Sequence, residues 1–545
     1  MKLKSTLKLF LSSLVILTLN ACNNEGEKLQ SGPSIIPQVQ ESEIGNGHFR
    51  IDRNTKIVID SDDQKVWDVA NYCVEQFNTA SGYSLSVSAP ERNKAARNSI
   101  IFTDKNLDQS SGDEGYTLTS NTSHIVLTGT AHGLFYAVQT LFQLLPEEIF
   151  SSKTLENIDW QIPSVSIIDK PRFKWRGMHL DVGRHMFPVS FIKKYIDYIA
   201  MHKLNTFHWH LTEDQGWRIE IKQYPRLTEM GSWRKGSQIP NSHEIDTLLY
   251  GGFYTQDEIR EVVAYAEERF VTVIPEIELP GHSVAALSAY PELSCTGGPF
   301  EVRTAWGISD DIYCAGNDSV FTFLENVLSE VLELFPSEYI HIGGDEAPKL
   351  RWEKCTKCQN RIKNESLKGE HELQSYFISR IEKFLNSKGR KIIGWDEILE
   401  GGLAPNAAVM SWRGIEGGIS AARQKHFVVM TPADYLYFCW YAGDPENEPP
   451  ALGGFLPLEK VYAYEPMPEG LSIDEQSYIM GVQACLWTEN IDTPELAEYM
   501  ILPRLCALSE IAWSPKEKRN FDDFSARLST HYGSLEELGV NYRRP

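Results

Sequence analysis

The segment Tyr339-Ile340-His341-Ile342-Gly343-Gly344-Asp345-Glu346 decides the fold, because a short apolar run ends there in two glycines and two carboxylates. Such a run is typical of a buried parallel strand, with polar residues beginning at its C-terminal end. The same pattern occurs eight times after residue 173. The runs are Trp175–Asp181, Thr206–Glu213, Val271–Glu278, Tyr339–Glu346, Lys391–Asp396, Ala408–Trp412, Phe427–Thr431 and Ile479–Glu489.

Amphipathic stretches of helix length lie between these runs and after the last one. They are Ser190–His202, Thr255–Phe270, Ser319–Phe335, Glu372–Ser387, Glu416–Lys425 and Pro494–Trp513. Strands that alternate with helices in this way predict an α/β fold, a (β/α)8 TIM barrel over residues 169–545. Because such barrels carry their chemistry at the C-terminal strand ends, we expect the polar residues there to form one site.

The chain before the barrel divides into three predicted parts. Residues 1–21 carry three lysines and then the apolar run Leu9–Leu19, which is typical of an export signal. Leu19-Asn20-Ala21-Cys22 resembles a bacterial lipobox, so we expect lipidation of Cys22; a plain secretory signal is the alternative. Residues 22–47 have the composition of a flexible tether. Residues 48–168 mix β-like and helical runs, which predicts a small α+β domain.

The amino-acid composition and net charge of the chain indicate which classes of molecule it binds. The 545 residues are 42% hydrophobic and 23% charged, which is typical of a globular chain, and the formal net charge is −22. A surface this acidic repels phosphates, so we expect no nucleic-acid partner and membrane contact only through the lipid anchor. The protein is then exported and anchored to a bacterial membrane, on its periplasmic or cell-surface side.

Cysteine and histidine motifs give only weak metal signals. Cys295 and Cys314 could close a loop as a disulfide, and Cys355-x-x-Cys358 is half of a zinc signature without a second pair nearby. For the latter pair we therefore expect a disulfide or free thiols. His208-x-His210 could begin a metal site, but few histidines stand at other strand ends. We predict neither a metal nor a cofactor.

The carboxylates at the run ends suit acid–base catalysis. Asp345 and Glu346 are adjacent carboxylates, and a like charge this close is expected to favour protonation of one of the two, as a general acid needs. The two glycines before them would let the backbone bend. Glu276 and Glu278 share a strand face and form either a catalytic pair or a structural network. Arg184 offers a bidentate donor for hydroxyls or carboxylates.

Together, these motifs resemble family 20 of the glycoside hydrolases, the exo-acting β-N-acetylhexosaminidases. The resemblance rests on five segments, in the order in which the family has them: Asp181–His185, His208–Arg218, Pro280–His282, Gly343–Glu346 and Ala484–Glu489. It implies a (β/α)8 barrel preceded by a small α+β domain. It also implies a carbohydrate substrate with a terminal, non-reducing GlcNAc or GalNAc.

The resemblance assigns roles to single residues. It implies a retaining, substrate-assisted reaction in which the substrate's acetamido carbonyl attacks C1 and forms an oxazolinium. Glu346 would be the general acid and base, and Asp345 would hold the acetamido N–H. The implied substrate-binding residues are Arg184 and Glu489 for hydroxyls, Trp395, Trp412 and Trp487 as walls, Tyr437 for the acetamido oxygen, His282 behind the acid, Glu213 where the family often has Asp, and Cys439 where relatives have Asp.

Two alternatives stay open at this point. An aromatic-rich, lipid-anchored chain could be a non-catalytic glycan-binding protein. The chain could also be a two-carboxylate retaining glycosidase that pairs Glu276 or Glu278 with Glu346. The sequence indicates neither the preferred sugar nor an oligomeric state.

Overall fold

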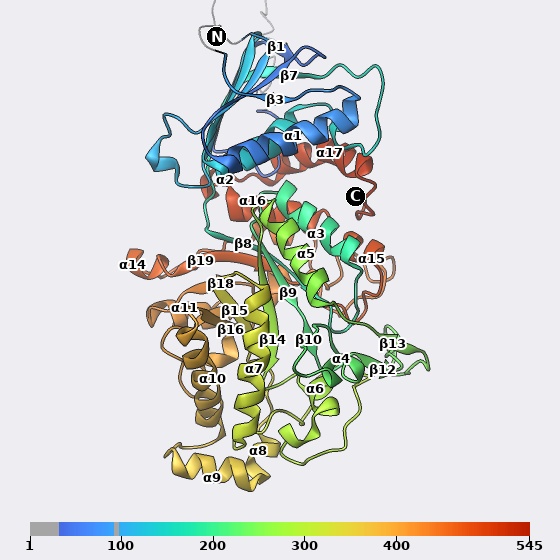
Figure 1. Ribbon diagram of the computed structural model, residues 1–545, viewed down its shortest axis with the longest axis vertical. Coiled ribbons are helices and arrows are strands. Elements are labelled where there is room, and N and C mark those ends of the chain that lie inside the picture. The colour runs from blue at the N-terminus through green and yellow to red at the C-terminus, as the bar shows by residue number, and fades with distance from the viewer. Residues whose placement is uncertain (1–31, 92–96) are drawn as a thin grey trace, which may run out of the picture. The chain divides into compact units, whose positions relative to one another are not determined.

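The computed structural model describes residues 32–91 and 97–545, which form an N-terminal α/β domain and a closed barrel (Figure 1). The predicted leader, Cys22 and the first part of the predicted tether lie outside the described residues. Within the described ranges, no helix is long and apolar enough to cross a membrane.

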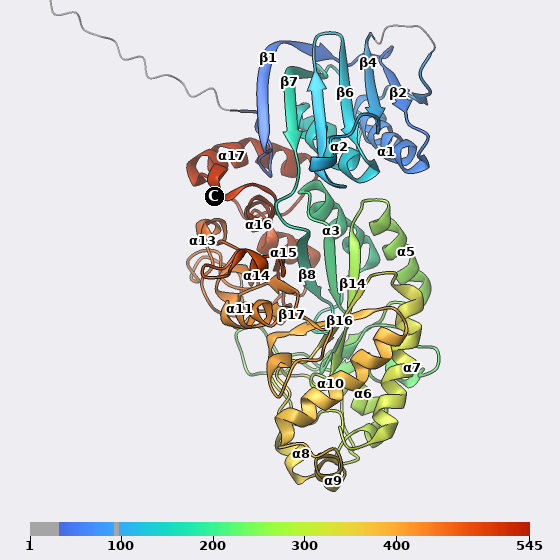
Figure 2. The ribbon, with the colours of Figure 1, turned by 90° about the vertical axis from the view of Figure 1, so that its left-hand side faces the viewer.

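The N-terminal domain is a seven-stranded sheet with two helices packed on one face (Figure 2). The strand order is β1-β7-β5-β6-β4-β2-β3. Its elements are β1 Glu41–Arg50, β2 Lys56–Asp60, α1 Gln64–Ser81, β3 Val87–Ser88, β4 Ser99–Thr103, β5 Tyr116–Ser120, β6 His124–Gly129, α2 Ala131–Leu144 and β7 Gln161–Asp169. This confirms the predicted mixture of strands and helices.

The predicted boundary between tether and domain is wrong. Strand β1 begins at Glu41, inside the expected tether, and pairs antiparallel with β7. Ile35 and Ile36 are also buried in the core. The segment looked like a linker because β1 is an edge strand whose side chains are almost all exposed, so its composition is polar.

Eight parallel strands close the barrel in the order β14-β15-β16-β17-β18-β19-β8-β9. Their bounds are β8 Trp175–Asp181, β9 Thr206–His210, β14 Thr272–Leu279, β15 Tyr339–Gly343, β16 Lys391–Trp395, β17 Ala408–Ser411, β18 Val428–Met430 and β19 Ile479–Ala484. Each lies within or almost within its predicted run, so the predicted barrel is confirmed. Several stop early, which leaves the polar ends of the runs on loops.

The helices that cover the barrel also match their predicted stretches, except the last. They are α3 Val189–Met201, α5 Gln256–Glu267, α7 Asp318–Leu334, α10 Glu370–Ser387 and α11 Glu416–Arg423. The stretch 494–513 forms two helices, α15 Pro494–Ile501 and α16 Arg504–Trp513. Pro503 stands between them and has no backbone N–H to continue the first helix.

Buried ion pairs join the two domains at the N-terminal ends of β8 and β9. Arg176 in β8 lies 2.6 Å from Glu114, and the Lys203 ammonium lies 2.9 Å from Asp169 at the end of β7. The Tyr116 hydroxyl donates to the same Asp169 carboxylate. The small domain therefore holds the end of the barrel opposite to the C-terminal strand ends.

Candidate active site

The acid pair stands on a sharp turn after β15. Gly343 and Gly344 have φ of 65° and 93°, and Glu346 has φ of 44°. A Cβ atom on Gly343 would lie 1.7 Å from Glu278 Oε2, so only glycine fits there. The turn ends β15 and projects Asp345 and Glu346 from the barrel, as the two glycines predicted.

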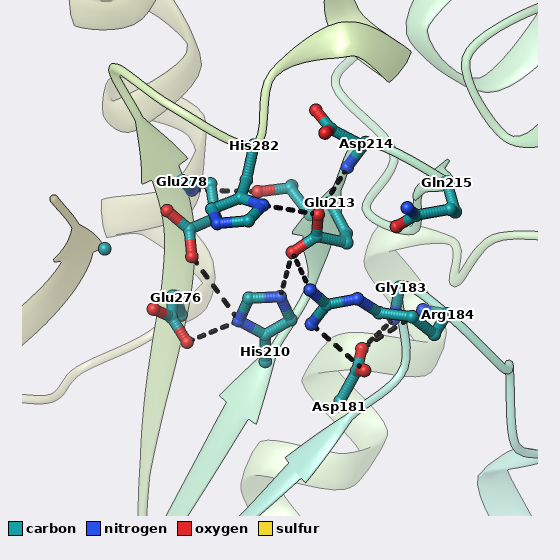
Figure 3. A network of polar contacts seen from close by, with 12 residues as sticks. Asp181, Gly183, Arg184, His210, Glu213, Asp214, Gln215, Glu276, Glu278 and His282 are labelled. Atoms are coloured by element: carbon teal, nitrogen blue, oxygen red, sulfur yellow. Dashed lines mark hydrogen bonds and ion pairs between the residues drawn. The ribbon is translucent and has the colours of Figure 1, made fainter. Parts of the chain in front are cut away.

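His282 brings the two carboxylates into one group. Its Nε2 atom lies 3.5 Å from Asp345 Oδ2 and 3.5 Å from Glu346 Oε2. On its other side, Nδ1 lies 2.8 Å from Glu213 Oε1 (Figure 3). Burial disfavours a charged ring, yet the Glu213 and Asp345 carboxylates raise the pKa of His282 well above its usual value. The acid pair is therefore backed by an imidazolium that Glu213 holds.

Arg184 is positioned by two buried carboxylates. Its Nη2 lies 3.1 Å from Glu213 and its Nη1 lies 3.3 Å from Asp181. Asp181 also accepts hydrogen bonds from the backbone N–H groups of Gly183 and Arg184, which fixes the loop after β8. Asp181 has a positioning role that the sequence analysis did not assign, although it begins a quoted motif.

A buried donor of Arg184 and a buried acceptor of the nearby Glu489 lack a hydrogen-bond partner. Arg184 Nε and Glu489 Oε2 are both buried and make no hydrogen bond with any described residue. The Arg184 guanidinium also lies 5.1 Å from the centroid of the Trp487 ring. A donor and an acceptor next to an aromatic face suit a sugar edge with its hydroxyls.

The aromatic residues expected around the sugar do come together. Trp395 and Trp487 have ring centroids 5.7 Å apart. Tyr437 stacks on Trp412 with centroids 6.0 Å apart and also lies 6.2 Å from Trp487. The Nε1 atoms of Trp395 and Trp412 donate to Glu276 and Glu397, respectively. Hydrogen bonds to buried carboxylates thus orient the rings of Trp395 and Trp412.

Tyr437 and Cys439 lie in a turn beyond the end of β18 and not on a strand. Strand β18 ends at Met430, the one-turn helix α12 (Ala433–Leu436) follows, and Tyr437 meets Cys485 as an isolated bridge. Cys439 is nevertheless buried near Glu489. Burial and the Glu489 carboxylate raise the pKa of Cys439 well above its usual value, so the thiol is neutral.

Glu276 and Glu278 have separate environments, which decides a question that the sequence left open. Glu276 lies 2.8 Å from His341 Nδ1, 3.0 Å from His208 Nε2 and 2.5 Å from His210 Nδ1. Despite burial, these histidines lower the pKa of Glu276 well below its usual value. Burial and the Asp345 and Glu276 charges raise the pKa of Glu278 well above its usual value. Glu276 is therefore part of an interior network.

Sequence reasoning missed Glu397 and the role of His210. Glu397 accepts from Trp412, and burial and the Asp345 carboxylate raise its pKa to about 8. His210 lies 3.3 Å from Glu213 and its pKa is raised to about 10, chiefly by Glu276 against the effect of burial. Glu397 directly follows the predicted run Lys391–Asp396, and His210 belongs to the motif His208-x-His210, so the sequence held a signal for each.

The comparisons with known proteins cover both domains and most of the described chain. The model for "Glycosyl hydrolase family 20, catalytic domain" matches residues 173–516, and that for "Glycosyl hydrolase family 20, domain 2" matches residues 32–170. A beta-hexosaminidase of Porphyromonas gingivalis is 47% identical over 97% of this chain and 67% of its own length.

Two solved structures share the architecture. The GH20 exo beta-N-acetylglucosaminidase of Vibrio harveyi, in complex with N-acetylglucosamine, has a TM-score of 0.83 at 34% identity, over 94% of this chain and 78% of its own. The GH20 beta-N-acetylhexosaminidase of Streptomyces coelicolor has a TM-score of 0.82 at 30% identity, over 94% of this chain and 98% of its own.

Proposed function

Because the chain belongs to glycosyl hydrolase family 20 and is a glycoside hydrolase, we propose that it is an exo-acting β-N-acetylhexosaminidase that releases terminal, non-reducing GlcNAc or GalNAc. The observation that carries this proposal is the convergence of Asp345 and Glu346 on His282, in a site that also brings together Trp395, Trp412, Trp487 and Tyr437.

We propose that the reaction is retaining and substrate-assisted. The acetamido carbonyl oxygen attacks C1 while Glu346 protonates the leaving oxygen, and Glu346 then deprotonates the water that opens the oxazolinium. Asp345 Oδ1 supports this assignment, since it is buried and accepts no hydrogen bond within the described part of the chain. It is a ready acceptor for the acetamido N–H. An attached nucleophile saves orientation entropy worth up to about 7–11 kcal/mol.

The contacts of Glu276 and Glu278 disfavour a two-carboxylate mechanism. A carboxylate nucleophile must be ionised and must reach C1. Glu276 is fully buried and bound by three histidines and Trp395, so its oxygens are engaged. Glu278 is buried with both oxygens unpartnered among the described residues, and its raised pKa keeps it protonated.

Three measurements test the proposal. The full chain should hydrolyse a chromogenic aryl N-acetyl-β-glucosaminide, whereas an aryl β-glucoside without the acetamido group should not react. A thiazoline mimic of the oxazolinium should inhibit. Asp345→Asn should lower kcat on the acetamido substrate while the control Asp257→Asn, an exposed carboxylate on α5, keeps it. Wild-type kcat in Asp345→Asn would refute substrate assistance.

We also propose that the enzyme is exported and anchored to a bacterial membrane through lipidated Cys22. The support is the sequence alone, a basic and apolar leader before Leu19-Asn20-Ala21-Cys22. In the native host, the enzyme should appear in the membrane fraction, and Cys22→Ser should release it. Equal membrane association of both forms would contradict the anchor.

A further inference from the structure

Four cysteines that are distant in sequence meet at one point outside the active site. Cys295 follows the 3₁₀ turn η3 (Pro291–Leu293), and Cys314 lies shortly before α7. Cys355 and Cys358 stand at the start of α9 (Thr356–Asn364), next to α8 (Leu350–Lys354), at the lower end of the view in Figure 2. In the sequence these residues form two separate pairs, Cys295 with Cys314 and Cys355 with Cys358, because 41 residues separate Cys314 from Cys355.

Three of the separations between the four sulfurs are those of a tetrahedral metal site. Cys314 Sγ lies 3.7 Å from Cys355 Sγ and 3.6 Å from Cys358 Sγ, and Cys295 Sγ lies 3.8 Å from Cys358 Sγ. All four sulfurs lie within 4.8 Å of one another. Zinc–thiolate bonds of about 2.3 Å in a tetrahedron place neighbouring sulfurs about 3.8 Å apart. The separations therefore match a four-thiolate zinc site.

We propose that these four cysteines bind one structural Zn²⁺ ion. Four protein ligands fill the tetrahedral shell and leave no position for substrate or water, which is the arrangement of structural and not of catalytic zinc. Cys314 and Cys358 are fully buried and Cys355 is nearly so, which protects the thiolates from solvent.

The surrounding backbone is built to hold the two halves of the cluster together. A Cβ atom on Gly316 would lie 2.1–2.3 Å from the backbone of Lys357 and Cys358, so the loops touch without a side chain between them. The Trp352 Nε1 group donates to the Tyr313 carbonyl at 2.9 Å. Contacts of this kind, outside the coordination shell, orient the ligands of a metal site.

Disulfides are the competing chemistry, because an exported protein meets oxidising conditions. Two disulfides require the four sulfurs to separate into two close pairs. Cys314 instead lies at almost the same distance from Cys355 and from Cys358, and Cys358 is also near Cys295. All four are free thiols in the structure. The geometry therefore favours a shared ion over any one pairing.

The position of the site links it to the acid pair. Cys295 and Cys314 belong to the long connection between β14 and α7, which also carries His282, while Cys355 and Cys358 follow Glu346 in the connection between β15 and α10. Zinc would clamp these two loops beyond the active site. Its removal should therefore lower thermal stability, and should lower activity by displacing His282 relative to the acid pair.

The test uses the full chain, purified without chelator, and elemental analysis by mass spectrometry. We expect about one zinc per chain, as a four-ligand site binds one ion. Cobalt substituted for zinc should give thiolate-to-cobalt charge transfer and the visible bands of tetrahedral cobalt. Cys358→Ser should lose the ion. The control Cys506→Ser should keep it, although Cys506 lies with His202 and His531 in another buried group of side chains that could ligate a metal.

Each other outcome would overturn the inference. Mapped disulfides among the four cysteines would do so, as would a zinc-free protein that stays zinc-free after reduction and addition of Zn²⁺. Retention of zinc in Cys358→Ser with its loss in Cys506→Ser would place the ion elsewhere. If Cys358→Ser does not fold, the cobalt spectrum of the wild-type chain decides alone. None of these measurements depends on hydrolytic activity.

Discussion

Replacement of Glu213 by Gln tests how the acid pair is supported. The side chain keeps its shape but loses the charge that faces Arg184 at 3.1 Å and His282 at 2.8 Å. Removing one charged partner from a buried ionic network lowers the free energy of unfolding by about 3–5 kcal/mol. Arg184 retains Asp181 as a partner, so we expect the lower end of this range.

Part of that loss should appear in catalysis, because His282 connects Glu213 to the acid pair. We expect kcat/KM on an aryl N-acetylglucosaminide to fall about a hundredfold, which corresponds to about 2.7 kcal/mol. The matched control is Glu498→Gln, which removes the charge of another buried glutamate, on α15, whose contacts are with Lys194, Tyr198 and Asn541 and not with a residue of the site. That variant should lose stability and keep its kcat/KM.

The pH profile separates a positioning role from a general structural one. Glu213 and Asp345 raise the pKa of His282, so the wild-type ring stays protonated through neutral pH and loses its proton only at high pH. Without the Glu213 charge, that pKa falls. The alkaline limb of kcat/KM should therefore move to lower pH in Glu213→Gln. An unchanged limb together with wild-type kcat/KM would refute the reasoning.

Three further predictions address single positions. Glu346→Gln should lose about 10²–10⁴-fold in kcat on poor leaving groups and much less on activated aryl groups; equal losses would contradict a proton donor. Gly343→Ala should disable hydrolysis, because its Cβ meets Glu278, whereas Gly389→Ala, also at positive φ but with nothing within 4 Å, should keep activity in the same assay. The neutral thiol of Cys439 lacks the charge of an Asp, so Cys439→Asp should lower kcat/KM on 6-sulfo-GlcNAc aryl glycosides relative to GlcNAc; equal ratios in both proteins would refute a role for the thiol.

The barrel could be predicted because its strands are apolar along their whole length and end in polar residues. The run Tyr339–Glu346 shows both the success and its limit: the strand is where the pattern put it, but it stops at Gly343. The strand ends there because Gly343 and Gly344 adopt positive φ, and the sequence indicates only that glycines can adopt this conformation. Strand β1 was missed for the opposite reason, since an exposed edge strand carries no apolar signal.

Long-range convergence explains the other gaps. The acid pair, Arg184 and the tryptophans could be collected from the sequence because each stands at a strand end, and parallel strands bring their ends to one edge. Glu276 and Glu278 could not be separated, because the charge state of Glu276 depends on histidines from β9 and β15, and that of Glu278 depends on burial and on the Asp345 and Glu276 carboxylates. The four cysteines could not be joined either, since they stand on long loops that no repeating pattern brings together.

The buried ion pairs between the small domain and the barrel bear on how such enzymes are inherited. Lys203 and Arg176 belong to the barrel, yet their anionic partners Asp169 and Glu114 belong to the preceding domain. A barrel that lost that domain would leave both cations without these partners and would expose the apolar surface that the domain covers, so the barrel would lose stability. We therefore expect gene rearrangements that separate the two halves to be selected against and the two domains to be inherited together.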